Sequence, residues 1–172
     1  MVSPPEIRDL ASASALAWDE IVQPYPEYIF ENGQRVTFGW VLRHKDDSCI
    51  FLKDKRCTVY KSRPWICKTY PFMLDNSSPK LPLLVFECEG LGSGSDTQQR
   101  DTHNEHILPL VHDLIARSNA EKSEEDGVFY QYQKWKKEQE ETHHSGKKDT
   151  TNWTVVIDSE GVTYVNNRDI TE

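Results

Sequence analysis

The sequence predicts an α+β protein: a small cysteine-bearing domain, a helical extension and a terminal β-hairpin. Three observations lead to this prediction. Apolar residues recur at helical spacing near the N-terminus, short β-branched and aromatic runs alternate with turn residues through the middle, and a charged helical pattern precedes two final β-rich runs. The 172 residues suit one domain with an appendage. Only 37% of them are hydrophobic, against about 45–50% ordinarily, so we expect a modest core beside a solvated helical part.

A helix is expected at the N-terminus, from about Pro4 to about Glu20. Ser3 and Glu6 are spaced as in a capping box, and proline stands just inside the helix start. Pro24 and Pro26 follow the expected helix end. The apolar positions that recur at helical spacing are Ile7, Leu10, Ala11, Trp18 and Ile21.

Short strands and one short helix are expected in the middle of the chain. They are the strand Gln34–Arg43, one hairpin made of residues 49–52 and 57–60 around the charged turn 53–56, the helix Arg63–Lys68 capped by Ser62, and the strand Leu83–Glu87. Pro71 follows the short helix, because the residue before a proline avoids the helical region. We find no internal repeat in this pattern.

The C-terminal half has a different character. Gly90–Ser95 is expected to be a flexible break. Beyond it, residues 107–115 and 128–139 predict two amphipathic helices, and residues 153–157 and 162–165 predict a hairpin around Asp158–Gly161. We therefore expect four parts: the cysteine-bearing domain 1–96, a helical extension 97–142, a linker 143–152 and the terminal hairpin 153–172.

Charge and hydropathy exclude several classes of partner. With 20 Lys and Arg against 28 Asp and Glu, the net charge is −8, and phosphate contacts need a cationic surface, so we expect no nucleic-acid partner. The longest apolar stretch, Leu81–Phe86, is far too short to span a membrane, and the first ten residues lack the apolar region of a signal peptide. We therefore expect a cytoplasmic protein without a membrane partner.

Four cysteines are the most informative residues: Cys49, Cys57, Cys67 and Cys88. They are too few for a disulfide scaffold, and in a reducing cytoplasm spaced cysteines favour metal binding or catalysis. The expected hairpin can supply two thiolates, the short helix a third and the end of the following strand a fourth, which together make a four-point cage. Their spacing matches no regular zinc finger, so buried structural thiols and a disulfide remain alternatives.

The charge around the cysteines supports the metal hypothesis independently. Residues 53–68 carry six cations and one anion, a net +5 in a chain of −8, so the rest of the chain carries −13. Nearby cations lower the pKa of thiols and favour the anionic thiolates that bind metal. The alternative interpretation is a solvated turn whose lysines deter strand pairing at an edge.

The cysteines lie in a long and specific motif. Cys57-Thr-Val-Tyr-Lys-Ser-Arg-Pro-Trp-Ile-Cys67-Lys-Thr-Tyr-Pro-Phe72, with Cys49 before it and Cys88-Glu-Gly after it, resembles the second half of the YkgJ-type CxxCxxCC family. The resemblance covers about residues 2–94 and implies a zinc- or iron-chelating domain, often described as iron–sulfur-containing. The family pattern has about eight cysteines, four of them in a first group. No cysteine precedes Cys49 here, so a missing upstream segment is one explanation that the resemblance leaves open.

We therefore expect a metal-binding protein with Cys49, Cys57, Cys67 and Cys88 as ligands of an iron–sulfur cluster, or alternatively of zinc. Some members of the resembled family are described as lysine N-methylases acting on flagellin, so an enzyme of that kind, or a redox enzyme with an auxiliary metal domain, is the alternative class. No methyl-donor motif or catalytic residue is evident. A third alternative is a metal-free interaction module that uses the helix around Trp135. His103, His106 and His112 are candidate outlying ligands, although solvated histidines are the commoner outcome, and His143–His144 is expected to be exposed in the linker.

Overall fold

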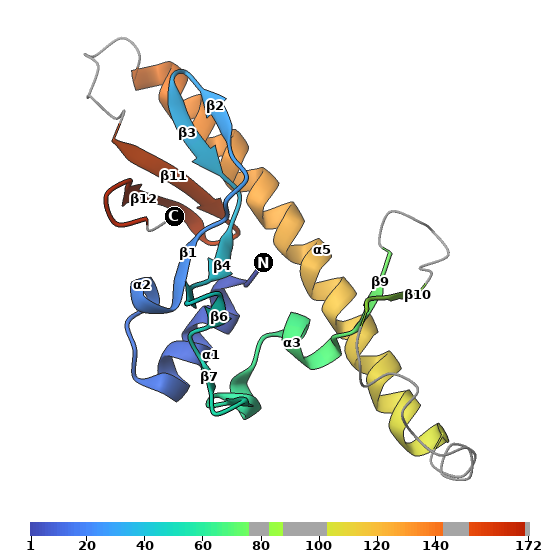
Figure 1. Ribbon diagram of the computed structural model, residues 1–172. Coiled ribbons are helices and arrows are strands. Elements are labelled where there is room, and N and C mark those ends of the chain that lie inside the picture. Colours follow the sequence, from blue (N-terminus) through green and yellow to red (C-terminus); the bar gives the residue numbers. More distant parts are fainter. Residues whose placement is uncertain (76–82, 88–102, 143–151, 171–172) are drawn as a thin grey trace. The chain divides into compact units, whose positions relative to one another are not determined.

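A computed structural model describes residues 1–75, 83–87, 103–142 and 152–170 (Figure 1). It confirms the α+β class. The chain divides into two compact units, residues 1–63 with 123–172 and residues 64–122. No helix among the described residues is both long and apolar enough to cross a bilayer.

The first unit contains short helices and two kinds of β-structure. Its helices are α1 (Pro4–Ser14), α2 (Trp18–Ile21) and the 3-10 helix η1 (Tyr60–Ser62). Its strands are β1 (Val22–Pro24), β2 (Ile29–Glu31), β3 (Gln34–Thr37), β4 (Trp40–Leu42), β5 (His44–Lys45), β6 (Ser48–Cys49), β7 (Leu52–Lys53), β8 (Arg56–Cys57), β11 (Trp153–Asp158) and β12 (Gly161–Asn166). The second half of helix α5 (His103–Thr142) completes it.

The N-terminal helix begins as predicted but ends early. The backbone N–H of Ser3 donates a hydrogen bond to the Glu6 carboxylate at 2.9 Å, as in a capping box. Ala15 adopts a left-handed conformation (φ 58°) and donates its N–H to the Ala11 carbonyl, which terminates α1. The single helix expected over residues 4–20 is therefore two helices, because the chain turns after Ser14 and restarts at Trp18.

A four-stranded sheet in the order β12-β11-β3-β2 is the main β-structure of this unit. The predicted terminal hairpin is confirmed: β11 and β12 pair from Trp153↔Asn166 to Asp158↔Gly161. β11 pairs in parallel with β3, which precedes it by more than one hundred residues in the chain. The strand expected over residues 34–43 is broken into β3 and β4 at Gly39, whose φ of 123° favours glycine.

Two apolar clusters hold the first unit together. One contains Val36, Val155 and Ile157 of the sheet with Trp135 of α5. The other joins α1, β1 and β4 to the segment that carries two cysteines, through the buried residues Val2, Ile7, Leu10, Ile21, Val22, Trp40, Phe51, Val59 and Val156. The buried Nε1–H of Trp40 donates to the Asp158 carboxylate at 2.9 Å, so β4 is also tied to the end of β11.

Helix α5 is one continuous helix of 40 residues, where the sequence predicted two. Within the first unit it approaches the β11–β12 turn very closely. A Cβ at Gly127 would lie 2.7 Å from the Ser159 Cβ, so only glycine fits at this helix position. Tyr132 donates a hydrogen bond to Glu31, and Lys136 lies 3.5 Å from the same carboxylate, so α5 also holds the edge strand β2.

The second unit comprises α3 (Trp65–Thr69), the strands β9 (Phe72–Leu74) and β10 (Leu83–Val85), and the first half of α5. β9 and β10 pair antiparallel from Phe72↔Val85 to Leu74↔Leu83. The buried guanidinium of Arg117 donates to the Thr69 hydroxyl at 2.7 Å and to the Met73 sulfur at 3.0 Å, and it is paired with Glu121. Arg117 therefore ties both α3 and β9 to α5.

Candidate metal centre

Two tandem hairpins carry Cys49 and Cys57. In the first, β5 pairs with β6 and places His44 opposite Cys49; in the second, β7 pairs with β8 and places Leu52 opposite Cys57. The predicted hairpin at the charged turn is therefore confirmed as β7–β8, but residues 49–52 are not one strand, and the preceding hairpin β5–β6 was not predicted. Each cysteine instead ends its own two-residue strand.

The hairpins are an internal repeat of eight residues. Residues 43–50 (RHKDDSCI) align with residues 51–58 (FLKDKRCT) and share lysine, aspartate and cysteine at equivalent positions. The expectation of no internal repeat is thus wrong. A repeated backbone places the two cysteines in equivalent settings, and both pack half-buried against the same apolar cluster.

Each hairpin closes through two residues in the left-handed conformation. Asp46 and Asp47 have φ of 51° and 58°, and Asp54 and Lys55 have φ of 50° and 60°. Positive φ at both central residues is what a type I′ turn requires, and this turn matches the natural twist of paired strands. Aspartate tolerates this conformation better than most residues, which explains the Lys-Asp sequence that begins both turns.

Hydrogen bonds define which cross-strand pairs are close. Ile50 N–H donates to the Arg43 carbonyl at 3.4 Å, and Thr58 N–H donates to the Phe51 carbonyl at 2.9 Å. Bonded and non-bonded pairs alternate along an antiparallel ladder, so His44↔Cys49 and Leu52↔Cys57 are non-bonded pairs, whose side chains lie closest together.

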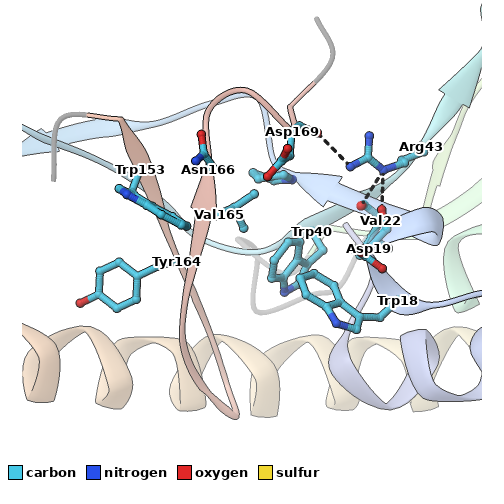
Figure 2. A pocket seen from close by; sticks show the side chains of 11 residues that line it. Trp18, Asp19, Val22, Trp40, Arg43, Trp153, Tyr164, Val165, Asn166 and Asp169 are labelled. Atoms are coloured by element: carbon cyan, nitrogen blue, oxygen red, sulfur yellow. Dashed lines mark hydrogen bonds between the residues drawn. The ribbon is translucent and has the colours of Figure 1, made fainter.

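Arg43 anchors the start of the first hairpin (Figure 2). Its Nε–H donates to the carbonyls of Asp19 and Val22, at 2.7 and 3.1 Å, and its Nη2 donates to the Asp169 carbonyl at 3.2 Å. Its backbone N–H donates to the Ile21 carbonyl at 2.9 Å. Arg43 therefore fixes the origin of the hairpins to other parts of the first unit through both its side chain and its backbone N–H.

Cys67 lies in α3 of the second unit, and its side chain is exposed. Thr69, two residues further, is fully buried and accepts the hydrogen bond from Arg117. Residues two apart on a helix lie on nearly opposite faces, so the Arg117 contact holds the face away from Cys67.

The second unit also fastens the segment that leads to the fourth cysteine. The Tyr70 hydroxyl donates to the Glu87 carbonyl at 2.5 Å, and Phe86 N–H donates to the Pro71 carbonyl at 2.8 Å. Cys88 itself lies outside the described residues, as do His143 and His144. The end of α3 and the residue before Cys88 are thus held together within this unit.

The described part of the chain contains no group of three or more His, Cys, Asp or Glu side chains arranged to hold a metal ion. Cys49 and Cys57 are free thiols. His112 is exposed, and the side chains of His103 and His106 are outside the described set. Thiolate chemistry suits zinc or iron, and the described residues supply individual donors for such a site without completing it.

His44 is a candidate donor that the sequence analysis missed. The sequence did contain a signal for His44. In the eight-residue repeat, His44 occupies the position opposite Cys49, and Leu52 occupies the equivalent position in the second repeat. Recognising it required the register of the two-residue strands, which the sequence pattern left undetermined.

A hollow of about 200 Å³ lies along the open edge of β12 in the first unit. Trp153 and Tyr164 lie on one side of the strand, and Trp18 and Trp40 lie on the other (Figure 2). Its lining residues are Trp18, Asp19, Val22, Pro24, Trp40, Arg43, Trp153, Tyr164, Val165, Asn166 and Asp169. Because this lining includes neither cysteine nor histidine, we treat the hollow as separate from the candidate metal centre.

Comparison with protein families identifies the domain. Residues 3–105 match the model of the CxxCxxCC family, described as a putative zinc- or iron-chelating domain. No curated protein and no solved structure matches the chain. The match covers more than half of the chain and includes the tandem hairpins, α3 and all four cysteines, so this protein belongs to the CxxCxxCC family of zinc- or iron-chelating domains.

Proposed function

We propose that this protein holds an iron–sulfur cluster, or alternatively zinc, through Cys49, Cys57, Cys67 and Cys88, in the reducing environment of the cytoplasm. The observation that carries the proposal is the tandem repeat, which presents one half-buried cysteine at the same position of each hairpin. A repeated hairpin with a thiol at the same position supplies two thiolates, the ligand type that iron–sulfur clusters and structural zinc sites use. The metal-binding domain proposed here comprises residues 1–96.

The second unit supports the other two ligands. Cys67 is exposed on α3, and the hydrogen bond from Tyr70 to Glu87 ties the end of that helix to the residue that precedes Cys88 in the chain. We infer that these two cysteines act as a pair, as Cys49 and Cys57 do in the first unit. Two pairs supply the four thiolates that a cluster or a structural zinc ion needs.

Electrostatics also supports thiolate ligands. The segment 53–68 holds six of the chain's 20 cations. Within it, the Arg63 guanidinium lies 3.9 Å above the centre of the Tyr60 ring, which gives that cation a defined place beside the second hairpin. A positive environment compensates the charge of thiolates and favours metal retention.

Anaerobic purification followed by metal analysis and absorption spectroscopy tests the proposal. We expect stoichiometric iron with broad visible absorption for a cluster, or stoichiometric zinc without it. Single Cys→Ser variants at the four positions should each lower metal content, while Ser48→Ala, beside Cys49 in β6, serves as the matched control. Metal content that is negligible in the wild-type chain after reconstitution, or unchanged in all four variants, would refute the proposal.

A further inference from the structure

We propose that His44 is a ligand of the metal that Cys49 binds, so that the centre has mixed sulfur and nitrogen coordination. This inference rests on the proposed metal-binding function. It adds a donor that lies outside the cysteine motif and that becomes evident through the strand pairing of β5 with β6.

The backbone geometry brings the two donors together. His44 and Cys49 are directly opposite in an antiparallel pair, and the Ile50–Arg43 hydrogen bond makes theirs a non-bonded pair. The Cβ atoms of such pairs lie about 4.5–5.5 Å apart and on the same face. With metal–sulfur and metal–nitrogen distances of about 2.3 and 2.0 Å, two donors on a tetrahedral ion are about 3.5 Å apart. A short side-chain adjustment therefore suffices for both to reach one ion.

The surroundings of the pair leave the imidazole available. Cys49 is half-buried against the apolar cluster, whereas His44 is exposed, so the thiol lies at the margin of the cluster and the imidazole is open to solvent. In the part of the chain that the structure describes, no side chain or backbone group forms a hydrogen bond or ion pair with the His44 ring.

The second hairpin is a natural comparison within the same molecule. Leu52 occupies the position of His44 and lies opposite Cys57 in an identical register. Leucine offers no donor, so the first hairpin supplies two ligand atoms and the second supplies one. Because a structural zinc ion takes four protein ligands, His44 would occupy one of the four positions and thiolates of the proposed function would occupy the other three.

This donor set selects the class of metal. A thiolate with an imidazole suits zinc and iron, including clusters in which histidine replaces cysteine on an iron, and it disfavours magnesium and calcium, which prefer oxygen. The nitrogen ligand is therefore compatible with both metals named in the proposed function.

Titration of the full-length apoprotein with Co²⁺ under anaerobic conditions tests the inference. Thiolate-to-cobalt charge transfer reports the sulfur ligands, and the visible ligand-field bands respond to replacement of nitrogen. We compare wild type with His44→Leu, which copies the second hairpin, and with His44→Gln. Leu52→His is the reciprocal variant, and Cys49→Ser is the positive control for a lost ligand.

We expect both His44 variants to retain the charge-transfer band, shift the ligand-field bands and bind Co²⁺ about 100-fold more weakly. The loss is this large because removing a group that only hydrogen-bonds to a ligand already costs about 10- to 100-fold in metal affinity. X-ray absorption of the zinc-loaded wild type should show imidazole scattering that His44→Leu lacks. Far-ultraviolet circular dichroism checks that each variant is folded, and His44→Gln decides the matter if His44→Leu unfolds.

Unchanged ligand-field bands and affinity in a folded His44 variant would overturn the inference while leaving the cysteine site intact. A wild-type chain that gives no charge-transfer band would instead overturn the proposed function itself, and the inference with it. Gain of nitrogen scattering in Leu52→His would show that the position opposite the cysteine is within reach of the metal.

Discussion

The four-stranded sheet and the tandem hairpins differ in what stabilises them. β11 pairs on both sides, and Val155, Val156 and Ile157 at its centre are fully buried. The hairpins have strands of two residues, exposed turns and half-buried cysteines. Burial of apolar surface contributes roughly 25 cal/mol per Å², so the sheet is stable through its own packing.

The hairpins depend on a few specific contacts. Phe51, between them, and Val59, after the second, are buried in the core, and Arg43 fixes the first hairpin through its hydrogen bonds to backbone carbonyls. A region stabilised mainly at its ends opens at lower free energy than a packed sheet. The sheet therefore acts as the scaffold. The proposed ligands Cys49 and Cys57 lie in the less stable hairpins, where metal binding can stabilise the structure most.

The largest expected effect is in the sheet. Ile157→Ala removes a fully buried side chain beside Trp135 and should lower the free energy of unfolding by about 2–5 kcal/mol. The graded control Ile157→Val should cost about 0.5–1.5 kcal/mol. Denaturant unfolding measures both. The sheet is expected to be stable without metal. If the loss of stability in Ile157→Ala disappeared on adding zinc, the idea that the sheet is stabilised by its own packing would be wrong.

A smaller effect of opposite sign is expected in the hairpins. Lys55 has φ of 60°, which costs an L-residue about 1–2 kcal/mol. Lys55→Gly should remove this strain and raise stability by up to about 1 kcal/mol after the entropy of glycine is deducted. Lys53→Gly, in the strand before the turn, is the matched control and should destabilise. The hydrogen-exchange rate of the Thr58 amide, which donates to the Phe51 carbonyl, measures how often the second hairpin opens. Faster exchange in Lys55→Gly would contradict a strained turn.

The smallest expected effect concerns the edge strand β2, which the hydrogen bond from Tyr132 to Glu31 holds to α5. The hydrogen bond from Tyr132 lowers the pKa of the Glu31 carboxyl from its ordinary 4.5, with help from Lys136, and the same hydrogen bond raises the pKa of Tyr132 from 10.0. The folded state thus prefers ionised Glu31 and neutral Tyr132. Their contribution to stability is present between about pH 4.5 and 10, and it is lost as the pH falls through the lowered pKa of Glu31 or rises through the raised pKa of Tyr132.

Glu31→Gln should therefore be slightly less stable than wild type at pH 7, and the difference should shrink below about pH 4.5. Unfolding followed by circular dichroism at several pH values measures it. Glu27→Gln, in the segment just before β2, is the control, because the hydrogen bond of Tyr132 goes to Glu31. A difference between wild type and Glu31→Gln that stays constant down to pH 3 would mean that the carboxylate charge does not hold the edge.

The sequence alone determined the elements whose signals are local. Ser3 and Glu6 specify the start of α1, because a capping box lies within four residues. The terminal hairpin follows from alternating β-branched residues around Asp158–Gly161, and the four cysteines with their motif led to the family that the comparison confirmed. The α+β class follows from the same local patterns.

Tertiary structure decided the rest, because the contacts concerned are weakly encoded or distant in the chain. The parallel pairing of β11 with β3 joins segments more than one hundred residues apart, and no local signal specifies it. Two-residue strands have too few side chains for periodicity to define a register, so the strand pairing within the repeat and the placement of His44 opposite Cys49 emerge only from backbone hydrogen bonds. A shift of one residue would turn these side chains to the opposite face, which is why register, more than composition, decides which donors can share a metal.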